Sequence, residues 1–442
     1  MRVFLLRALR IVIRADSDPA RQALFANLSQ SRLAVRLAYG LHERLGGGRA
    51  SALLVSCYGL ASFLRIAPPR NRGARILAVA KHANARRQVD RVFALVGRED
   101  CGWVRTGRKA MFSPSGLAAA VLLKPGRLVT AFRIVRGIDG RHGFLVSCRA
   151  AGAIAWYARA KAILDADRPG AILVSSDSNP EEVGFTSAAR ALGIPQAFVS
   201  HAYPTPFSPP LDFSLSILEG EAAVRARKRR GPIKGEIVLA GLEGDSSPLD
   251  SRRFERTSPV IGIFAPKAVS WPTLAAIVED CRRHFGASKM VIRWHPSRLD
   301  PARRIHMLGD LTGIVESSTT ASLPDVARQC DWVIADENSN VHLPVLKLGI
   351  PTVAVKRLGL YPESRSDLYG FAANGVIFPP VSSIRDVQAE ALIAFFSEGW
   401  PARFQQYDAS YLRPQAAISG EVRRATWRLF EDSRIESDAC AR

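Results

Sequence analysis

The chain repeats one pattern of hydrophobic and polar positions in two places. In 171–200, an apolar stretch is followed by polar residues, a stretch of helical length, the sequence Leu-Gly-Ile-Pro and a second apolar stretch. The same order recurs in 332–355, again with Leu-Gly-Ile-Pro before the last apolar stretch. Each copy predicts a right-handed βαβ unit, with its polar elbow at the carboxyl end of a parallel strand.

Two such units predict an α/β protein with two Rossmann-like domains facing a cleft, which is the natural place for a ligand. Apolar stretches at 75–80 and 260–264 are the expected first strands of the two domains. We expect a basic amphipathic helical region at 1–72, an N-terminal Rossmann-like domain at 73–245, a C-terminal Rossmann-like domain at 259–400 and a helical tail at 401–442.

Composition supports a globular, cytoplasmic protein. Of the 442 residues, 47% are hydrophobic and 23% are charged, which is typical of a chain with real cores. The six cysteines are scattered and form no CxxC pair. They predict reduced thiols in the cytoplasm, and exclude a disulfide framework or a zinc site.

The net charge lies entirely in the N-terminal third. Residues 1–170 hold 30 Lys and Arg against 9 Asp and Glu, which equals the +21 of the whole chain. Such an asymmetry indicates an anionic partner, either nucleic acid or the cytoplasmic leaflet of a membrane. Because aliphatic rather than aromatic residues alternate with the basic ones, the sequence favours a membrane surface and no nucleic acid.

The first fourteen residues are one candidate for the membrane contact. As a helix, they place Arg7, Arg10 and Arg14 on one side and aliphatic residues on the other. The alternative is an ordinary amphipathic helix docked on its own domain. Arginines interrupt the apolar stretch, so a signal peptide is a poor interpretation.

Two uncharged runs, 51–64 and 110–123, are too short to span a bilayer. They predict core helices or interfacial segments. We therefore expect a peripheral protein at the inner face of the membrane.

Candidate chemistry in the second domain begins where an apolar strand at 289–292 ends. Arg293 and His295 follow it, and His295 precedes Pro296 in the sequence. An imidazole there is suited to donate a hydrogen bond to a phosphate oxygen of a departing nucleotide, with help from Arg293. Lys267, in the turn after the first strand of this domain, is expected near the same phosphates. A lone histidine at a strand end is, alternatively, structural.

The elbow at 336–340 is the second candidate donor site. Asn338, Ser339 and Asn340 precede a predicted helix at 341–348, whose first N–H groups would form an anion site. Glu337 is expected to accept a sugar hydroxyl or an arginine. The alternative is a helix cap without a ligand.

In the first domain, the strand at 196–199 ends at His201, our candidate general base for an acceptor hydroxyl. Asp177, at the preceding elbow, is the alternative base or the carboxylate that orients His201. Both residues are, alternatively, simple caps of a strand and a helix.

These motifs resemble the GT-B glycosyltransferases, most closely the bacterial surface-polysaccharide branch with the polysialyltransferases and the CDP-glycerol glycerophosphotransferases. The resemblance covers about 75–400 and rests on His201, the proline-rich loop after it, Asp212, His295-Pro296 and the serine-bearing elbow closed by Leu-Gly-Ile-Pro. It implies that His295, Ser339 and Asn338 contact the donor phosphate, and that His201 activates the acceptor. Those relatives often have His-Gly and paired serines where this chain has His201-Ala202 and Asn338-Ser339-Asn340.

The resemblance implies transfer of a sugar or polyol-phosphate group from a nucleotide-activated donor to a hydroxyl of a membrane-associated glycan or lipid, in surface polysaccharide synthesis. No metal or other cofactor is expected, since GT-B sites commonly need none. The alternatives are a sugar-nucleotide epimerase on the same fold and a non-enzymatic protein that binds polyanions or membranes.

Overall fold

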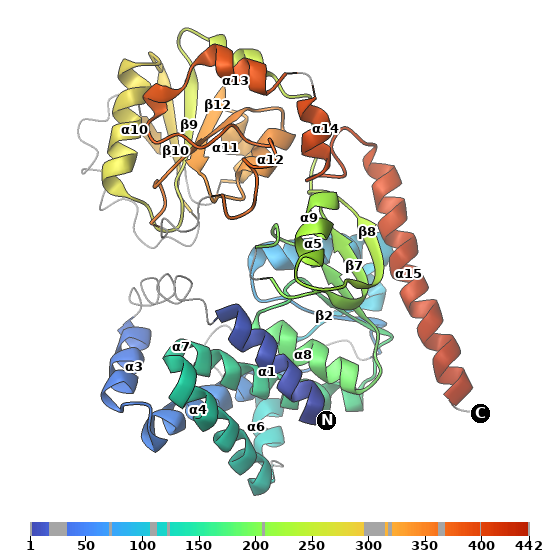
Figure 1. The fold of residues 1–442 in the computed structure, drawn as a ribbon. Coiled ribbons are helices and arrows are strands. Elements are labelled where there is room, and N and C mark those ends of the chain that lie inside the picture. The colour runs from blue at the N-terminus through green and yellow to red at the C-terminus, as the bar shows by residue number, and fades with distance from the viewer. Residues whose placement is uncertain are drawn as a thin grey trace. The chain divides into compact units, whose positions relative to one another are not determined.

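The computed structural model describes residues 2–16, 33–69, 73–106, 113–121, 124–205, 208–295, 314–316, 321–360, 367–397 and 399–440 (Figure 1). The chain divides into two compact units. Unit 1 comprises Met1–Leu218, Val224–Val238 and Ser419–Arg442, and unit 2 comprises Glu219–Ala223 and Leu239–Ile418. Each unit is built around its own sheet.

The sheet of unit 1 has six strands in the order β3-β2-β5-β6-β7-β8. Neighbouring strands from β3 to β7 run parallel. Its strands are β2 (Ile76–Val79), β3 (Cys101–Trp103), β5 (Ala171–Val174), β6 (Gln196–Val199), β7 (Asp212–Leu218) and β8 (Lys234–Leu239). Every residue of β2, β5 and β6 is buried, as expected for parallel strands covered on both faces.

Helices make up most of the rest of unit 1. They are α1 (Arg2–Asp16), α3 (Leu33–Arg44), α4 (Arg49–Leu64), α5 (Ala83–Val96), α6 (Pro114–Val121), α7 (Pro125–Ala166), α8 (Pro180–Ala191) and most of α15 (Gln415–Cys440). The residues of α9 (Glu221–Lys228) belong partly to each unit. A short antiparallel pair, β1 (Ile66–Ala67) with β4 (Arg105–Thr106), and a 3-10 turn, η1 (Arg98–Asp100), complete this unit.

The long helix α7 is two helices that meet at Gly143. This glycine has φ 74° and ψ 179°, which is outside the helical region and is accessible to a residue without Cβ. Both parts pack within the helical portion of unit 1, where α7 contacts α1, α4 and α8.

Helix α1 docks on its own unit. Ala8 and Val12 pack with Ala153 and Val183, and Leu9 packs with Val146. The apolar side of the helix is therefore buried against α7 and α8. The interpretation of 1–14 as a lipid-facing helix is thus wrong for the apolar side of the helix, because α7 and α8 cover that side. The alternative, an amphipathic helix docked on its own domain, is the one observed.

The sheet of unit 2 has five parallel strands in the order β11-β10-β9-β12-β13. They are β9 (Val260–Phe264), β10 (Lys289–Arg293), β11 (Ile314–Glu316), β12 (Trp332–Asp336) and β13 (Thr352–Val355). The helical elements described in unit 2 are η2 (Ser251–Glu255), α10 (Trp271–Arg283), α11 (Leu323–Ala327), α12 (His342–Lys347), η5 (Ile384–Asp386), α13 (Ala389–Phe395) and α14 (Trp400–Gln405).

The two repeated sequence patterns are βαβ units, as predicted. Strands β5 and β6 are parallel and joined through α8, and β12 and β13 are parallel and joined through α12. In both copies the glycine of Leu-Gly-Ile-Pro ends the helix with a positive φ, 68° at Gly193 and 77° at Gly349. The expected α/β class with two Rossmann-like sheets is confirmed.

Candidate functional site

The strand orders place one topological switch point in each sheet. In unit 1 the chain runs from β2 to β3 on one side and then continues with β5 on the other side of β2. In unit 2 the strands β10 and β11 lie on one side of β9, and β12 and β13 lie on the other. Ligands of open α/β sheets bind outside the carboxyl ends of the strands at such points. The loops after β2, β5, β9 and β12 are therefore the expected ligand-binding loops.

In unit 2, basic side chains gather where β9 and β10 end. Arg293, the last residue of β10, is paired in register with Phe264 of β9, and its guanidinium carbon is 5.7 Å from the centre of the Phe264 ring. The N–H of Ala265 donates to the carbonyl oxygen of Arg293 at 2.9 Å, which joins the two loops. Lys267 follows in the β9 loop and His295 in the β10 loop.

His295 titrates far below its usual range. Burial, and then the positive charges of Lys267 and Arg293, lower the pKa of this imidazole to about 4. The ring is therefore neutral at pH 7 in the protein alone, and can take up a proton when an anion offsets the two cations. Pro296, which the sequence pattern places next to it, lies outside the described residues.

The elbow after β12 is a turn held by its own side chains. The Asp336 carboxylate accepts hydrogen bonds from the N–H groups of Asn338 at 3.0 Å and Gly359 at 2.6 Å. Burial raises the pKa of Asp336 to about 6. The Asn338 side-chain oxygen accepts from the Leu368 N–H at 2.7 Å, and the Ser339 hydroxyl accepts from the Val341 N–H at 3.3 Å.

The helix predicted after this elbow is observed. It is predicted at 341–348, and α12 runs from His342 to Lys347 with Val341 and Leu348 as its cap residues. His342 is buried, and its ring nitrogens lie 2.9 Å from the Thr352 hydroxyl and 3.0 Å from the Asp336 carbonyl oxygen. Glu337 donates its N–H to Val355 at 3.3 Å.

Several buried side-chain N and O atoms have no hydrogen-bond partner among the described residues. At this end of the sheet they include Nε of Arg293, at the end of β10, and the side-chain oxygen of Asn340, after β12. Buried polar atoms of native proteins are nearly always bonded to protein or water, so each exception requires an explanation. A ligand at the unit 2 switch point, with an acceptor for Arg293 and a donor for Asn340, would explain both atoms.

In unit 1, the backbone orients His201. Nδ1 of this half-buried ring lies within hydrogen-bond distance of the Ser175 carbonyl oxygen, at the end of β5. A carbonyl only accepts, so Nδ1 carries the proton, and Nε2 of the neutral ring is the acceptor. Burial is the main cause that lowers the pKa of His201, with a smaller contribution from the charge of Arg227. A neutral ring with an accepting Nε2 is the form that a general base requires.

Asp177 is bound to an arginine rather than to His201. Its carboxylate forms an ion pair with Arg227, whose side chain is 4% exposed. Arg227 also donates to the Pro209 carbonyl oxygen at 3.0 Å, and its guanidinium carbon is 5.5 Å from the centre of the Phe198 ring. The interpretation that Asp177 orients His201 is therefore wrong as a hydrogen-bond arrangement, because the Ser175 carbonyl holds the ring and Arg227 holds the carboxylate.

The loop after β2 adds residues that the sequence interpretation did not include. The N–H of Lys81 donates to Glu182 at 3.0 Å, and the Lys81 ammonium lies 2.7 Å from the Glu181 carboxylate. Glu182 is fully buried, and burial raises its pKa to about 8. Burial and the nearby charges of Lys81 and His201 lower the pKa of His82.

The unit 1 switch point thus brings His82, Lys81, Asp177 and His201 to the carboxyl ends of three adjacent strands. The signal that could have identified Lys81 and His82 is their position directly after a buried apolar strand. The same rule selected His201 and His295. Among the described residues, no group of three or more His, Cys, Asp or Glu side chains is arranged to hold a metal ion.

No family model matches the chain, and no curated protein does. Solved structures match at low identity. A putative UDP-N-acetylglucosamine 2-epimerase from Listeria monocytogenes is 10% identical, with a TM-score of 0.49 over 82% of this chain and 98% of that one. MurG from Acinetobacter baumannii is 12% identical, with a TM-score of 0.41 over 81% and 98%. The glycotransferase of kitacinnamycin is 15% identical, with a TM-score of 0.44 over 82% and 100%. Similarity at this level does not identify a reaction.

Proposed function

We propose that the protein is a GT-B glycosyltransferase. It moves a sugar or a polyol-phosphate group from a nucleotide-activated donor to a hydroxyl of a membrane-associated glycan or lipid, at the inner face of the membrane. Unit 2 takes the donor and unit 1 the acceptor. The observation that carries the proposal is the set of basic and unsatisfied polar groups at the switch point of the unit 2 sheet.

The donor side is suited to a diphosphate. Lys267 and Arg293 supply fixed positive charge, and His295 is close enough to both for their charges to lower its pKa. When the bond to the transferred group breaks, negative charge develops on the departing phosphate. Preorganised cations and hydrogen-bond donors stabilise that charge in the transition state. Ser339, Asn338 and Asn340 would contact the same phosphates or the nucleoside, and Glu337 a sugar hydroxyl.

On the acceptor side, His201 removes the proton. The acceptor oxygen forms the new bond to the transferred group, its proton passes to Nε2 of His201, and the nucleotide phosphate leaves with the electron pair of the broken bond. The Ser175 carbonyl, as acceptor from Nδ1–H, stabilises the resulting imidazolium. Such a base typically accelerates a reaction by about 10²–10⁴-fold.

A thermal-shift panel tests the donor assignment. The purified protein is heated with CMP, CDP, UDP, GDP or TDP, and we expect stabilisation by one nucleotide class. A ligand at about 100 times its dissociation constant stabilises the folded state by roughly 2.7 kcal/mol. If none of the five nucleotides shifts the midpoint, the donor assignment fails.

The matching activated sugar then separates transfer from epimerisation. A transferase incorporates label from the donor into a membrane fraction, whereas an epimerase converts the donor without any acceptor. Loss of incorporation in His201→Gln, with nucleotide stabilisation unchanged, supports the proposed base. A new sugar epimer formed from the donor alone would contradict the proposal.

A further inference from the structure

Three helical elements of unit 1 expose aliphatic side chains. We name as the apolar face Leu53 and Leu60 of α4, Leu117 and Val121 of α6, and Leu128 and Val129 at the start of α7. Their exposed fractions run from 43% for Leu60 to 85% for Val121. Exposed single leucines are normal, but aliphatic residues gathered on adjacent elements indicate an interaction surface.

The elements that carry the apolar face are joined. Leu53 and Leu60 are seven residues apart on α4, which places them on one side of that helix. The N–H of Ser113, just before α6, donates to the Leu64 carbonyl oxygen at the end of α4 at 2.9 Å. Helices α4 and α6 contact each other, and α4 also packs along α7 (Figure 1).

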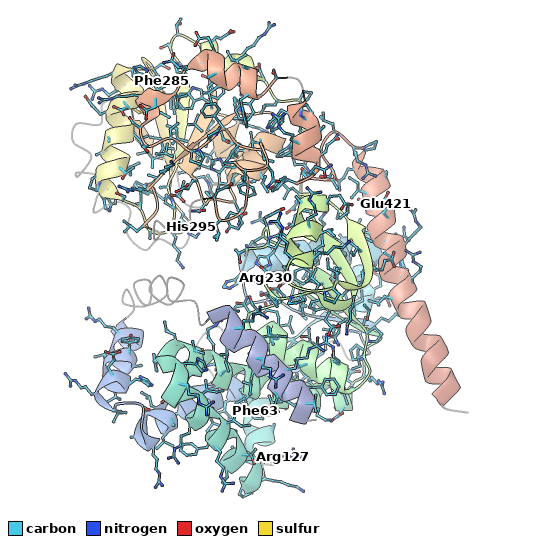
Figure 2. All side chains as sticks on the ribbon, in the orientation of Figure 1. Phe63, Arg127, Arg230, Phe285, His295 and Glu421 are labelled. Carbon is cyan, nitrogen blue, oxygen red and sulfur yellow. The ribbon has the colours of Figure 1, made fainter. Side chains whose placement is uncertain are left out.

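The charged residues near the apolar face in the sequence are all basic. Lys124 and Arg127, between α6 and Leu128, are exposed, and so are Arg133 and Arg136 further along α7. The sequence has no Asp or Glu in 44–89 or in 101–138, which include α4, α6 and the first part of α7 up to Ile138. Figure 2 shows Arg127 near the end of the helical portion of unit 1, in the same part as Phe63 of α4.

We infer that the apolar face is the surface by which this protein sits on an anionic bilayer. Its leucines and valines enter the acyl boundary, and the surrounding lysine and arginines meet lipid phosphates. This inference rests on the proposed function in one respect, since it places unit 1 beside a lipid-borne acceptor. The apolar face takes the place of α1 as the expected lipid-facing surface, because α7 and α8 cover the apolar side of α1.

The chemistry of the apolar face favours lipid over other partners. Nucleic acid would require aromatic or polar side chains for stacking and groove contacts, whereas this surface is aliphatic. A second copy of the chain would bring two positively charged surfaces together, which is unfavourable. None of the described helices is long and apolar enough to cross a membrane, so the contact proposed is with one leaflet.

Flotation with vesicles tests the inference on the full chain. We expect binding to vesicles of phosphatidylcholine with phosphatidylglycerol, little binding to phosphatidylcholine alone, and weakening by salt. The double variant Leu117→Ser/Val121→Ser should lower the partition coefficient by about tenfold or more, and Lys124→Gln/Arg127→Gln should lower it for the anionic vesicles.

The matched control is Leu360→Ser, an exposed leucine of unit 2 at 62% exposure, which should bind as the wild type does. Circular dichroism and the nucleotide-induced thermal shift monitor folding and the donor site separately from lipid binding. The inference is overturned if the wild-type protein does not float with the anionic vesicles, or if the Leu117→Ser/Val121→Ser variant floats as well as the wild type. Loss of the nucleotide shift alone would count against the proposed function and not against this surface.

Discussion

At the scale of single residues, the surroundings of two histidines determine what they can do. The Ser175 carbonyl fixes which nitrogen of His201 is protonated, and burial, together with the charges of Lys267 and Arg293, keeps His295 neutral at pH 7. The sequence predicted both histidines from their positions after apolar strands. It could not predict the tautomer of His201, because the Ser175 carbonyl lies 26 residues away in the chain. It could not predict the pKa of His295, because burial and the proximity of Lys267 follow only from the pairing of β9 with β10.

The tautomer of His201 is directly measurable. We expect ¹⁵N chemical shifts at pH 7 to show a neutral ring with the proton on Nδ1, because that nitrogen faces a carbonyl oxygen and burial lowers the pKa. His201→Gln identifies the signal. A ring protonated on Nε2 alone, or an imidazolium at this pH, would rule out the assigned role as a base.

Glu182 should make stability depend on pH. Its pKa of about 8 in the folded protein exceeds the ordinary 4.5, so between these values the folded state binds more protons than the unfolded state. The contribution of Glu182 to the free energy of unfolding therefore falls as the pH rises from about 5 to 8. This pH-dependent contribution is absent in Glu182→Gln, which retains an acceptor for the Lys81 N–H.

The measurement is urea denaturation of both proteins across that pH range. The stability of the wild type relative to Glu182→Gln should decrease as the pH rises. A pH-independent difference between the two would show that Glu182 does not titrate there.

At the scale of elements, repeated patterns were predictable and competing contacts were not. The two βαβ units could be predicted, because both copies have the same apolar stretches and a helix-ending glycine, Gly193 or Gly349. The contacts of the elbow before α12 could not, because the Asn338 side chain accepts a hydrogen bond from the Leu368 N–H, 30 residues further along the chain. Amphipathic α1 fits a lipid surface and a protein surface equally well in sequence, and only the packing against α7 and α8 decides between them.

Helix α1 should therefore contribute to stability. Leu9 is 3% exposed and Leu6 is 42% exposed on the same helix. Leu9→Ala removes buried methyl groups and should cost about 2–5 kcal/mol of unfolding free energy, whereas Leu6→Ala should cost much less. Denaturant titration of the two variants checks this. Equal, small losses would mean that α1 is not docked as described.

The basic residues at the end of α9 and just after it, from Arg225 to Arg230, separate into one structural arginine and several exposed charges. Arg227 is buried with Asp177, whereas Arg229 is exposed. Arg227→Ala leaves a largely buried carboxylate without its partner and should cost about 3–5 kcal/mol. Arg229→Ala should have little effect. The comparison is made by thermal or chemical denaturation, and similar stabilities of the two variants would contradict the assignment.

At the scale of the whole molecule, each unit presents its candidate site residues at one place, the carboxyl ends of strands beside a switch point. The sequence predicted the α/β class and most of these residues, because strand ends can be recognised from apolar runs. The partners that hold them, such as Glu182 for the Lys81 loop and Arg227 for Asp177, could not be predicted, since they lie 101 and 50 residues away in the chain.

The central claim is that the unit 2 switch point binds the phosphates of a nucleotide. Its most direct test is isothermal titration of UDP and CDP into the wild type, His295→Ala, Lys267→Met and the control His284→Ala, which alters an exposed histidine of the same unit. Charged hydrogen bonds contribute about 1.5–3 kcal/mol, so each site variant should lose roughly tenfold or more in affinity. The control should bind like the wild type. Absence of binding to either nucleotide, or equal binding by His295→Ala and Lys267→Met, would contradict the account.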